Sequence, residues 1–416
     1  MRVSNFIGDL YMNDTSIAIL VTVVAFVVSG LVFPKTLKFA RQHDIVDNPN
    51  ARKLQRIPIP VLGGVAVYTG IMSAAVLLLV FYQNYTLMWT IMGMTVMQAI
   101  GTWDDMEDIS AILRFLIEIA LVGAFIALTD IYIDDLHGLW GIHQIEPELG
   151  IPLSILAGVG IINATNLIDG VDGYASGYSM MASLLFAIAF ACVWDNSMVC
   201  MALIVAGALL PFFMHNVFGV RSKMFMGDGG TLMLGVVMTV FVLYSLSSHT
   251  SCDSLDERGV SLTGLTLAIL CIPVFDTLRV MSARIARGRS PFRPDKTHLH
   301  HLFIDMGFSH LGAALFILFL NLLVVVTWFI SYQLGATIDL QTYIVALLGM
   351  GVTFGFYKLM RMQQNGGPKD EDGYPTGTWL WHLMCRLGTW THREDKRSWR
   401  VMRWFMDVPM MKWMKY

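Results

Sequence analysis

Long apolar runs alternate with short polar segments along most of the chain, and this pattern limits the possible folds more than any other feature. Of the 416 residues, 55% are hydrophobic and only 14% are charged, whereas a soluble domain carries about 25% charged residues. A helix that crosses a membrane needs roughly 20 mostly apolar residues. The sequence therefore predicts an all-α polytopic membrane protein with about eleven transmembrane helices. We expect the spans at about residues 16–33, 61–82, 86–101, 111–129, 151–166, 175–194, 198–214, 229–248, 260–279, 311–331 and 341–359.

The spans divide the chain into three parts. Residues 1–15 form a short polar tail, because they lack the basic region and cleavable apolar stretch of a signal peptide. Residues 16–359 form one membrane domain. Residues 360–416 carry six tryptophans after position 378 among many lysines and arginines, a composition that favours the membrane–water interface. We expect this tail to lie on the inner membrane surface, with a dimer contact as the alternative.

The lysines and arginines indicate the orientation, because these residues accumulate in cytoplasmic loops. In the eleven-span arrangement, 26 of the 28 fall on one side of the membrane, with segments 34–60 and 279–310 especially rich. Only Arg2 and Arg258 fall on the other side. The sequence therefore predicts an N-terminus outside and a C-terminus in the cytoplasm.

Acidic residues and histidines gather where spans meet the cytoplasmic side. Ionisable groups near the membrane interior are costly and usually functional. Five helix ends from distant parts of the sequence supply them, which indicates one site facing the cytoplasm. The clustered residues are Asp104, Asp105, Asn166, Asp169, Asp172, Asp228, Asp276, His298, His300 and His301.

These residue types are typical of phosphate chemistry with a metal. Several carboxylates with little sulfur nearby suit a hard cation such as Mg²⁺ or Mn²⁺. Asp228 lies between glycines at a helix start, where anions are favoured, and we expect Gly227, Gly229 and Gly230 to let a phosphate approach the chain. The arginines and histidines of segment 279–301 are suited to binding phosphate. Together they predict phosphoryl transfer, in which catalysis is mostly positioning and charge stabilisation.

Each cluster also has a purely structural interpretation. A single carboxylate at a helix end is as often a solvated residue or a helix cap as a catalytic group, and the histidines of segment 298–301 could form a polar loop. Arg114 and Glu118, four residues apart, are expected to be a structural pair within the fourth helix. The coincidence of several clusters on one membrane face favours the functional interpretation.

Five motifs resemble one family, the polyprenyl-phosphate N-acetylhexosamine-1-phosphate transferases, over about residues 34–330. They are LGGVAVY (62–68), Asp104-Asp105, NATNLIDGVDG (163–173), FMGDGGTLMLG (225–235) and SPFRPDKTHLHHLF (290–303). The last motif has His298-Leu299-His300-His301, where the peptidoglycan translocase of the family usually has three consecutive histidines. It is similar to the bacterial enzymes that start O-antigen and enterobacterial common antigen. The resemblance therefore favours a small UDP-N-acetylhexosamine, with N-acetylglucosamine first, over a UDP-muramyl-peptide.

The resemblance implies a multi-pass enzyme of the bacterial inner membrane, a homodimer with its active site in the cytoplasm and no nucleic-acid partner. Undecaprenyl phosphate would attack the β-phosphate of the UDP-sugar and release UMP, as the first membrane step of a cell-surface polysaccharide. Asp228 would bind Mg²⁺, with Mn²⁺ as the alternative cation. Asp104 or Asp105 would deprotonate or position the lipid phosphate, and the three histidines of segment 298–301 would contact the pyrophosphate or the sugar.

The remaining implied positions concern binding of the UDP-sugar. Asn166, Asp169 and Asp172 would position the nucleotide. The interval from Asn216 to Asp228 is longer than in some relatives, which weakens the assignment of Asn216. The other implied substrate contacts are the nucleoside pair Asn216 and Phe225, a phosphate contact from Lys53 or Arg56, and Arg293 and Lys296 near the pyrophosphate or sugar.

Two other classes of membrane protein share some of these features. An ion-coupled transporter also carries acidic residues in many spans, but it binds near the membrane midplane, whereas these acids lie at one face. The CDP-alcohol phosphotransferases use paired DG segments too, but they need an arginine-containing stretch within the motif, and none follows Asp169 and Asp172.

Overall fold

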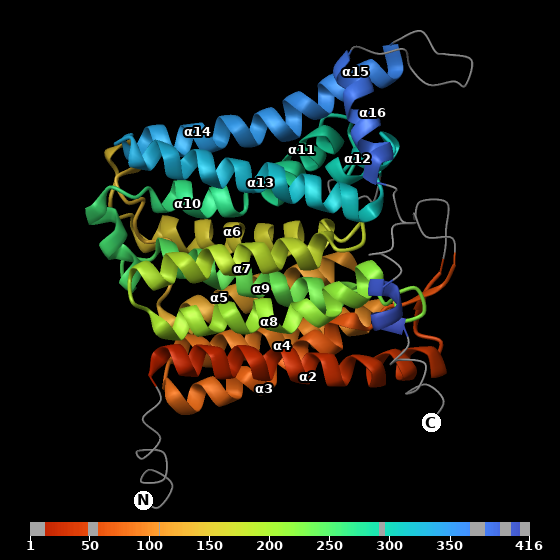
Figure 1. Ribbon diagram of the computed structural model, residues 1–416. Helices are drawn as coiled ribbons and strands as arrows, with labels where there is room; N and C mark the ends of the chain where they lie inside the picture. Colours follow the sequence, from red (N-terminus) through yellow and green to blue (C-terminus); the bar gives the residue numbers. More distant parts are fainter. Residues whose placement is uncertain are drawn as a thin grey trace, which may run out of the picture.

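The computed structural model describes residues 13–48, 57–107, 109–290, 296–366, 379–391 and 401–407. It is a bundle of long helices that lie side by side (Figure 1). The long helices are α2 (Asp14–Gln42), α3 (Gly63–Phe81), α4 (Tyr85–Met106), α5 (Ala111–Thr129), α6 (Pro147–Leu167), α7 (Tyr174–Cys192), α8 (Asn196–Phe218), α9 (Gly227–Leu246), α10 (Leu262–Ile269), α11 (Cys271–Ile285), α13 (His310–Gln333) and α14 (Ile338–Met350).

Shorter elements join or cap these helices. A π-helical segment, η3 (Gly351–Phe356), continues α14 into α15 (Tyr357–Gly366). The others are β1 (Val46–Asp47), β2 (Ile59–Pro60), the 3-10 helices η1 (Leu139–Gly141) and η2 (Ser251–Arg258), α12 (Leu299–Asp305), α16 (Trp379–Thr391) and a helical segment at 401–407. At the right-hand end of the bundle in Figure 1 lie α12, α15 and α16.

The all-α, polytopic fold class is confirmed. Within the described residues, nine helices are long and apolar enough to cross a membrane, or ten if α10 and α11, bent by 76°, form one broken span. The remaining expected span, 86–101, coincides with α4, which is not among these ten although it packs along α9. The sequence of α4 includes Gln98 and several threonines, as well as Asp104 and Asp105 near its end. Every predicted span therefore corresponds to a helix or to the bent pair, and the orientation and the three-part division stay predictions.

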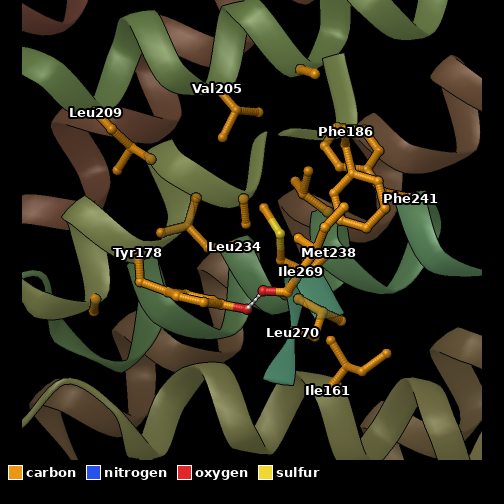
Figure 2. Close-up of a cluster of buried hydrophobic side chains, with 14 of the residues drawn as sticks. Ile161, Tyr178, Phe186, Val205, Leu209, Leu234, Met238, Phe241, Ile269 and Leu270 are labelled. Atoms are coloured by element: carbon orange, nitrogen blue, oxygen red, sulfur yellow. Dashed lines mark hydrogen bonds between the residues drawn. The ribbon is translucent and has the colours of Figure 1, made fainter. Parts of the chain in front are cut away.

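The central helix is α9, which contacts α3, α4, α6, α7 and α10. All of its residues except Asp228 are buried. Around it, Phe186 packs on Phe241, with ring centroids 5.4 Å apart, in an apolar core (Figure 2). A helix that is apolar on every side belongs in such an interior, so α9 holds its polar first turn at a fixed place.

The break between α10 and α11 is stabilised by polar side chains. Backbone groups freed within a membrane must find partners in the protein. The hydroxyl of Tyr178 donates to the carbonyl of Ile269 at 3.2 Å (Figure 2). Asn321 donates to the same carbonyl at 3.0 Å and accepts from the N–H of Ile272 at 3.0 Å. The bend therefore has satisfied hydrogen bonds, and it turns α11 toward the histidine segment.

Glycines allow the backbones of α3 and α4 to contact the backbone of the first turn of α9. A Cβ added at Gly64 would lie 2.4 Å from the Cα of Gly230, and one added at Gly101 would lie 2.5 Å from the Cα of Gly229. The expectation that Gly227, Gly229 and Gly230 admit a phosphate is therefore wrong, because all three are buried against neighbouring parts of the chain. This packing leaves Asp228 as the residue of the turn that reaches the surface.

The loop that follows α2 is held beside the same turn. The strands β1 and β2 pair as a small antiparallel sheet. The N–H of Phe225 donates to the carbonyl of Pro60 at 2.8 Å, and the N–H of Gly63 donates to the carbonyl of Phe225 at 2.9 Å. The LGG and FMGDGG motifs are thereby joined, although they lie more than 160 residues apart in the sequence.

Candidate active site

An acidic cavity lies at the end of the bundle where α4 stops and α9 begins. Its volume is about 210 Å³. Two valines contribute to its wall, but most of the lining is polar, because four carboxylates face it. The lining residues are Val46, Asp47, Val61, Asp104, Asp105 and Asp228. Three residues predicted for the site therefore share one cavity.

Asp105 holds the start of α9. Its carboxylate accepts from the N–H of Asp228 at 2.8 Å and from the N–H of Gly229 at 3.2 Å. The first N–H groups of a helix have no partner within the helix, and a carboxylate there also interacts favourably with the helix dipole. Asp105 is therefore a cap supplied by α4, which fixes the position of Asp228.

Arg114 lies between two carboxylates of the cavity. One nitrogen, Nη1, is 2.8 Å from Asp104 and 3.1 Å from Asp228. Its Nε is 3.8 Å from Glu118, so the expected pair within α5 exists but is the longest of the three contacts. Sequence reasoning missed this bridging role, because a spacing of four residues drew attention to Glu118 alone.

The Asp228 side chain is partly open to solvent and has an amide partner. Its exposed fraction is 38%, and its second oxygen accepts from Nδ2 of Asn166 at 3.1 Å. The same nitrogen lies 3.1 Å from the hydroxyl of Thr231. The last turn of α6 thus contributes Asn166 as a hydrogen-bond partner of Asp228.

Asp169 and Asp172, close neighbours in the NLIDGVDG turn, have different surroundings. The carboxylate of Asp172 lies 2.5 Å from Nζ of Lys223 and 2.9 Å from Nδ1 of His310. Burial would raise the pKa of Asp172, but His310 and Lys223 outweigh it and hold this pKa below its ordinary value. Sequence reasoning missed both partners, since each is a lone basic residue far away in the chain.

Asp169 has a side chain that reaches the surface. Crowding by surrounding protein atoms and the negative charges of Asp228 and Asp172 raise the pKa of Asp169 to about 7. A cation near Asp169 would remove this repulsion, since an opposite charge favours the ionised form. The two carboxylates thus tolerate each other because the Lys223 ammonium offsets the charge of Asp172.

Asp276, near the middle of α11, anchors the histidine segment. Its buried carboxylate accepts from Nε and Nη2 of Arg279 at 3.2 and 2.6 Å. It lies 3.0 Å from Nδ1 of His298 and 3.1 Å from the N–H of Leu299. Arg279 also donates to the carbonyl of Thr297 at 2.6 Å. Asp276 and Arg279 therefore fix the chain that enters α12.

His300 and His301 lie side by side, with ring centroids 4.3 Å apart. His300 touches the NLIDGVDG turn, because a Cβ added at Gly170 would lie 2.0 Å from its Nε2. Burial, helped by the neighbouring histidines, holds the pKa of His300 well below its usual range and lowers the pKa of His301 to about 4. An uncharged imidazole keeps one N–H donor and one acceptor nitrogen, so each ring can still donate one hydrogen bond to a phosphate or a sugar.

The remaining predicted contacts have different surroundings. Asn216 is buried, accepts from the N–H of Gly173 at 2.7 Å and donates to the carbonyl of Met224 at 3.0 Å. Phe225 is half-buried with Lys223 5.8 Å from its ring centroid. Three of the predicted contacts fall outside the described residues: Lys53, Arg56 and Arg293. Lys296 is exposed, and its positive charge helps to lower the pKa of His301.

The acidic cavity suits a hard divalent cation that is shared with a substrate. In the part of the chain that the structure describes, no three His, Cys, Asp or Glu residues are close enough to hold a metal ion by themselves. Mg²⁺ commonly uses one or two carboxylates and completes its shell with waters and substrate phosphates. The Arg114 guanidinium contacts both Asp104 and Asp228. These two carboxylates therefore already have a positively charged partner, as they would in the presence of a bound cation.

Comparison with known proteins matches the chain to one family model and to named transferases. Residues 87–246 match the model of glycosyl transferase family 4. The undecaprenyl-phosphate alpha-N-acetylglucosaminyl 1-phosphate transferase of Escherichia coli (strain K12) is 30% identical over 296 residues, covering 70% of this chain and 77% of that protein. A probable undecaprenyl-phosphate N-acetylglucosaminyl 1-phosphate transferase of Bacillus subtilis (strain 168) is 30% identical over 331 residues, covering 78% and 88%.

Proposed function

The chain belongs to glycosyl transferase family 4, and we propose that it transfers N-acetylglucosamine 1-phosphate from its UDP-sugar to undecaprenyl phosphate. The observation that carries the proposal is the placement of Asp228 on an acidic cavity where several membrane helices end. A lipid phosphate can reach such a place from the membrane and a nucleotide can reach it from water. The two relatives from Escherichia coli and Bacillus subtilis, both named for this lipid and this sugar, support the same substrates.

The reaction exchanges one phosphorus–oxygen bond for another. An oxygen of the lipid phosphate attacks the β-phosphorus of the UDP-sugar, and the bond between this phosphorus and the bridging oxygen breaks. UMP leaves with the bridging oxygen, and the product is undecaprenyl-diphosphate-linked N-acetylglucosamine. A lipid phosphate is already ionised at neutral pH, so positioning and charge compensation are the main tasks of the protein.

On the lipid side, the acids and Arg114 organise charge. Asp105 fixes Asp228 through the backbone of α9, and Arg114 keeps Asp104 and Asp228 from repelling each other. Asp228 would hold Mg²⁺ or Mn²⁺, with Asp104 and Arg114 beside it. The metal ion, when bound, neutralises charge on the transferring phosphoryl group.

On the nucleotide side, the turn after α6 and the histidine segment bind and orient the donor. Asn166 and Asp169 lie next to the cavity, and Lys223 offsets the charge of Asp172. The uncharged His300 and His301 donate hydrogen bonds to the pyrophosphate or the sugar.

The proposal also places the site on the cytoplasmic side of a bacterial inner membrane, with the N-terminus outside and the C-terminus inside. The basic loops support this orientation, since 26 of the 28 lysines and arginines fall on one side in the eleven-span arrangement. The product would start a cell-surface polysaccharide, and the active protein would be a homodimer.

The position of a labelled phosphate tests the proposal. The purified protein is incubated in lipid nanodiscs with undecaprenyl phosphate, Mg²⁺ and UDP-N-acetylglucosamine carrying ³²P in its β-phosphate. Phosphoryl transfer puts the label into the lipid phase, whereas transfer of the sugar alone leaves the label in water-soluble UDP. Label that stays in the aqueous phase while labelled sugar enters the lipid would overturn the proposal.

A further inference from the structure

A carboxylate from the C-terminal tail occupies a group of backbone N–H donors in the loop between α8 and α9. Asp407, in the helical segment 401–407, accepts from the N–H of Arg221 and from the N–H of Ser222, both at 3.0 Å. It also accepts from the N–H of Val220 at 3.2 Å and from the Ser222 hydroxyl at 3.0 Å. Consecutive N–H groups that converge in this way form an anion-binding concavity.

The surroundings of this contact favour a negative charge. Hydrogen bonds to an ionised acceptor are about twice as strong as those between neutral groups. Arg41, in the last turn of α2, acts electrostatically on Asp407 and donates to the carbonyl of Arg221. Ser222 is fully buried, so its hydroxyl and N–H depend on a partner in the protein. The loop is therefore held from one side by α2 and from the other by the tail.

The loop carries residues of the candidate active site. Lys223 follows Ser222 directly and places its Nζ 2.5 Å from Asp172. Next, the carbonyl of Met224 accepts from Asn216, and Phe225 pairs with Pro60. One residue spans at most about 3.8 Å between Cα atoms, so an ordered Ser222 restricts where Lys223 can lie.

We propose that Asp407 is a positioning residue, which orders the loop 220–222 and thereby keeps Lys223 on Asp172 in the nucleotide-binding part of the site. The carboxylate acts through Ser222 and Lys223 and need not touch the substrate. The proposal rests on the proposed function for its kinetic consequence, and the ordering of the loop can be measured without turnover.

The alternative role for this segment is membrane attachment alone. Trp404 and Phe405 of the same helix are 60% and 57% exposed, which suits the membrane–water interface. If the segment served only for membrane attachment, Trp404→Ala would change loop exchange and KM as much as a substitution at Asp407. If Asp407 positions the loop, its carboxylate is the essential group. The charge-retaining variant Asp407→Glu should then keep most of the loop order and most of the UDP-sugar affinity that Asp407→Asn loses.

The experiment compares full-length wild-type protein, Asp407→Asn, Asp407→Glu and Trp404→Ala in lipid nanodiscs. A matched control is Asp339→Asn, which neutralises a carboxylate that accepts one backbone N–H, from Trp140 at 2.7 Å. Asp339 lies in the first turn of α14, and α14 begins at the end of the bundle opposite to α15 and α16 (Figure 1). Hydrogen exchange at residues 220–222 reports the order of the loop. Initial rates over a range of UDP-N-acetylglucosamine concentrations separate KM from kcat.

In Asp407→Asn we expect exchange at 220–222 to be about tenfold faster and KM for the UDP-sugar to rise about tenfold. The amide oxygen can still accept at the Oδ1 position, but the substitution removes the charge that about doubles the strength of these hydrogen bonds. The turnover number should change less than KM, and Trp404→Ala and Asp339→Asn should leave both readouts unchanged. Unchanged exchange in Asp407→Asn would overturn the proposal, as would faster exchange with an unchanged KM. A wild-type protein without turnover would refute the proposed function, while the exchange rates would still decide whether Asp407 orders the loop.

Discussion

Substitution of Asp276 by asparagine should release the histidine segment while leaving the membrane spans folded. Asp276 is 3% exposed and accepts hydrogen bonds from Arg279, His298 and the backbone of Leu299. Asparagine has the same shape, but it carries one acceptor oxygen and an NH₂ group that would face these donors. Depending on how the amide is oriented, either the His298 contact or both Arg279 hydrogen bonds therefore lose their acceptor oxygen. The buried guanidinium loses its counter-ion in both cases.

The size of the effect follows from the contacts that remain. Removing one partner of a buried ion pair costs about 3–5 kcal/mol. Arg279 keeps its hydrogen bond to Thr297 at 2.6 Å and its position over the Tyr357 ring, 3.7 Å from the centroid. We therefore expect the lower end, about 3 kcal/mol, which corresponds to a shift on the order of a hundredfold in the population of the ordered segment.

Initial rates and circular dichroism test this prediction together. In Asp276→Asn, kcat/KM should fall by on the order of a hundredfold if the ordered segment is required for transfer, with the helical content unchanged. The control is again Asp339→Asn, whose carboxylate lies far from the histidines and whose activity should equal the wild type. Wild-type kcat/KM in folded Asp276→Asn would refute the conclusion that this carboxylate holds the histidine segment.

Three further predictions concern the acidic turn and the histidines. Asp228→Asn should lower metal-dependent turnover by at least about a hundredfold with an unchanged unfolding temperature, and normal rates would exclude the metal role. Gly64→Ala should reduce folded yield and unfolding temperature, because its Cβ would lie 2.4 Å from the Gly230 backbone; a stable variant would contradict this close packing. The lowered pKa values of His300 and His301 predict a loss of stability as pH falls from about 6.5 toward 4, because the unfolded chain binds these protons first. Unfolding temperatures of wild type and of His301→Gln measured across this range test the sign, and the variant should lose less stability on acidification.

Hydropathy predicted most of the fold because the membrane leaves a chain few options. Backbone groups within a bilayer must bond internally, so each apolar run of sufficient length becomes a helix. The approximate positions of ten spans followed directly. The segment 86–101 shows where composition alone is insufficient, since α4 is held in the bundle by its packing on α9 and keeps polar residues such as Gln98 buried.

The acidic residues of the candidate site could also be found in the sequence, but their partners could not. Arg114 reaches Asp104, ten residues before it, and Asp228, 114 residues after it. A pattern of four-residue spacing predicts only its contact with Glu118. Long side chains choose partners by tertiary position, which local spacing does not encode.

The glycines of the FMGDGG motif illustrate a second limit. Glycine permits close approach of any backbone or ligand, and the sequence does not tell which one comes near. Here the approaching groups are the backbones of α3 and α4 at Gly64 and Gly101. Asp407 is a third case, since no sequence pattern links this aspartate to a loop 185 residues earlier.

Release of UMP under metal control tests the central claim most directly. Purified protein in lipid nanodiscs is given undecaprenyl phosphate with UDP-N-acetylglucosamine, UDP-N-acetylgalactosamine or UDP-muramyl-pentapeptide, each with Mg²⁺ and with EDTA. The account predicts UMP from UDP-N-acetylglucosamine, its loss in EDTA and its return when Mg²⁺ is restored. Folded protein that releases no UMP from any donor, or that releases UMP equally well in EDTA, would contradict the account.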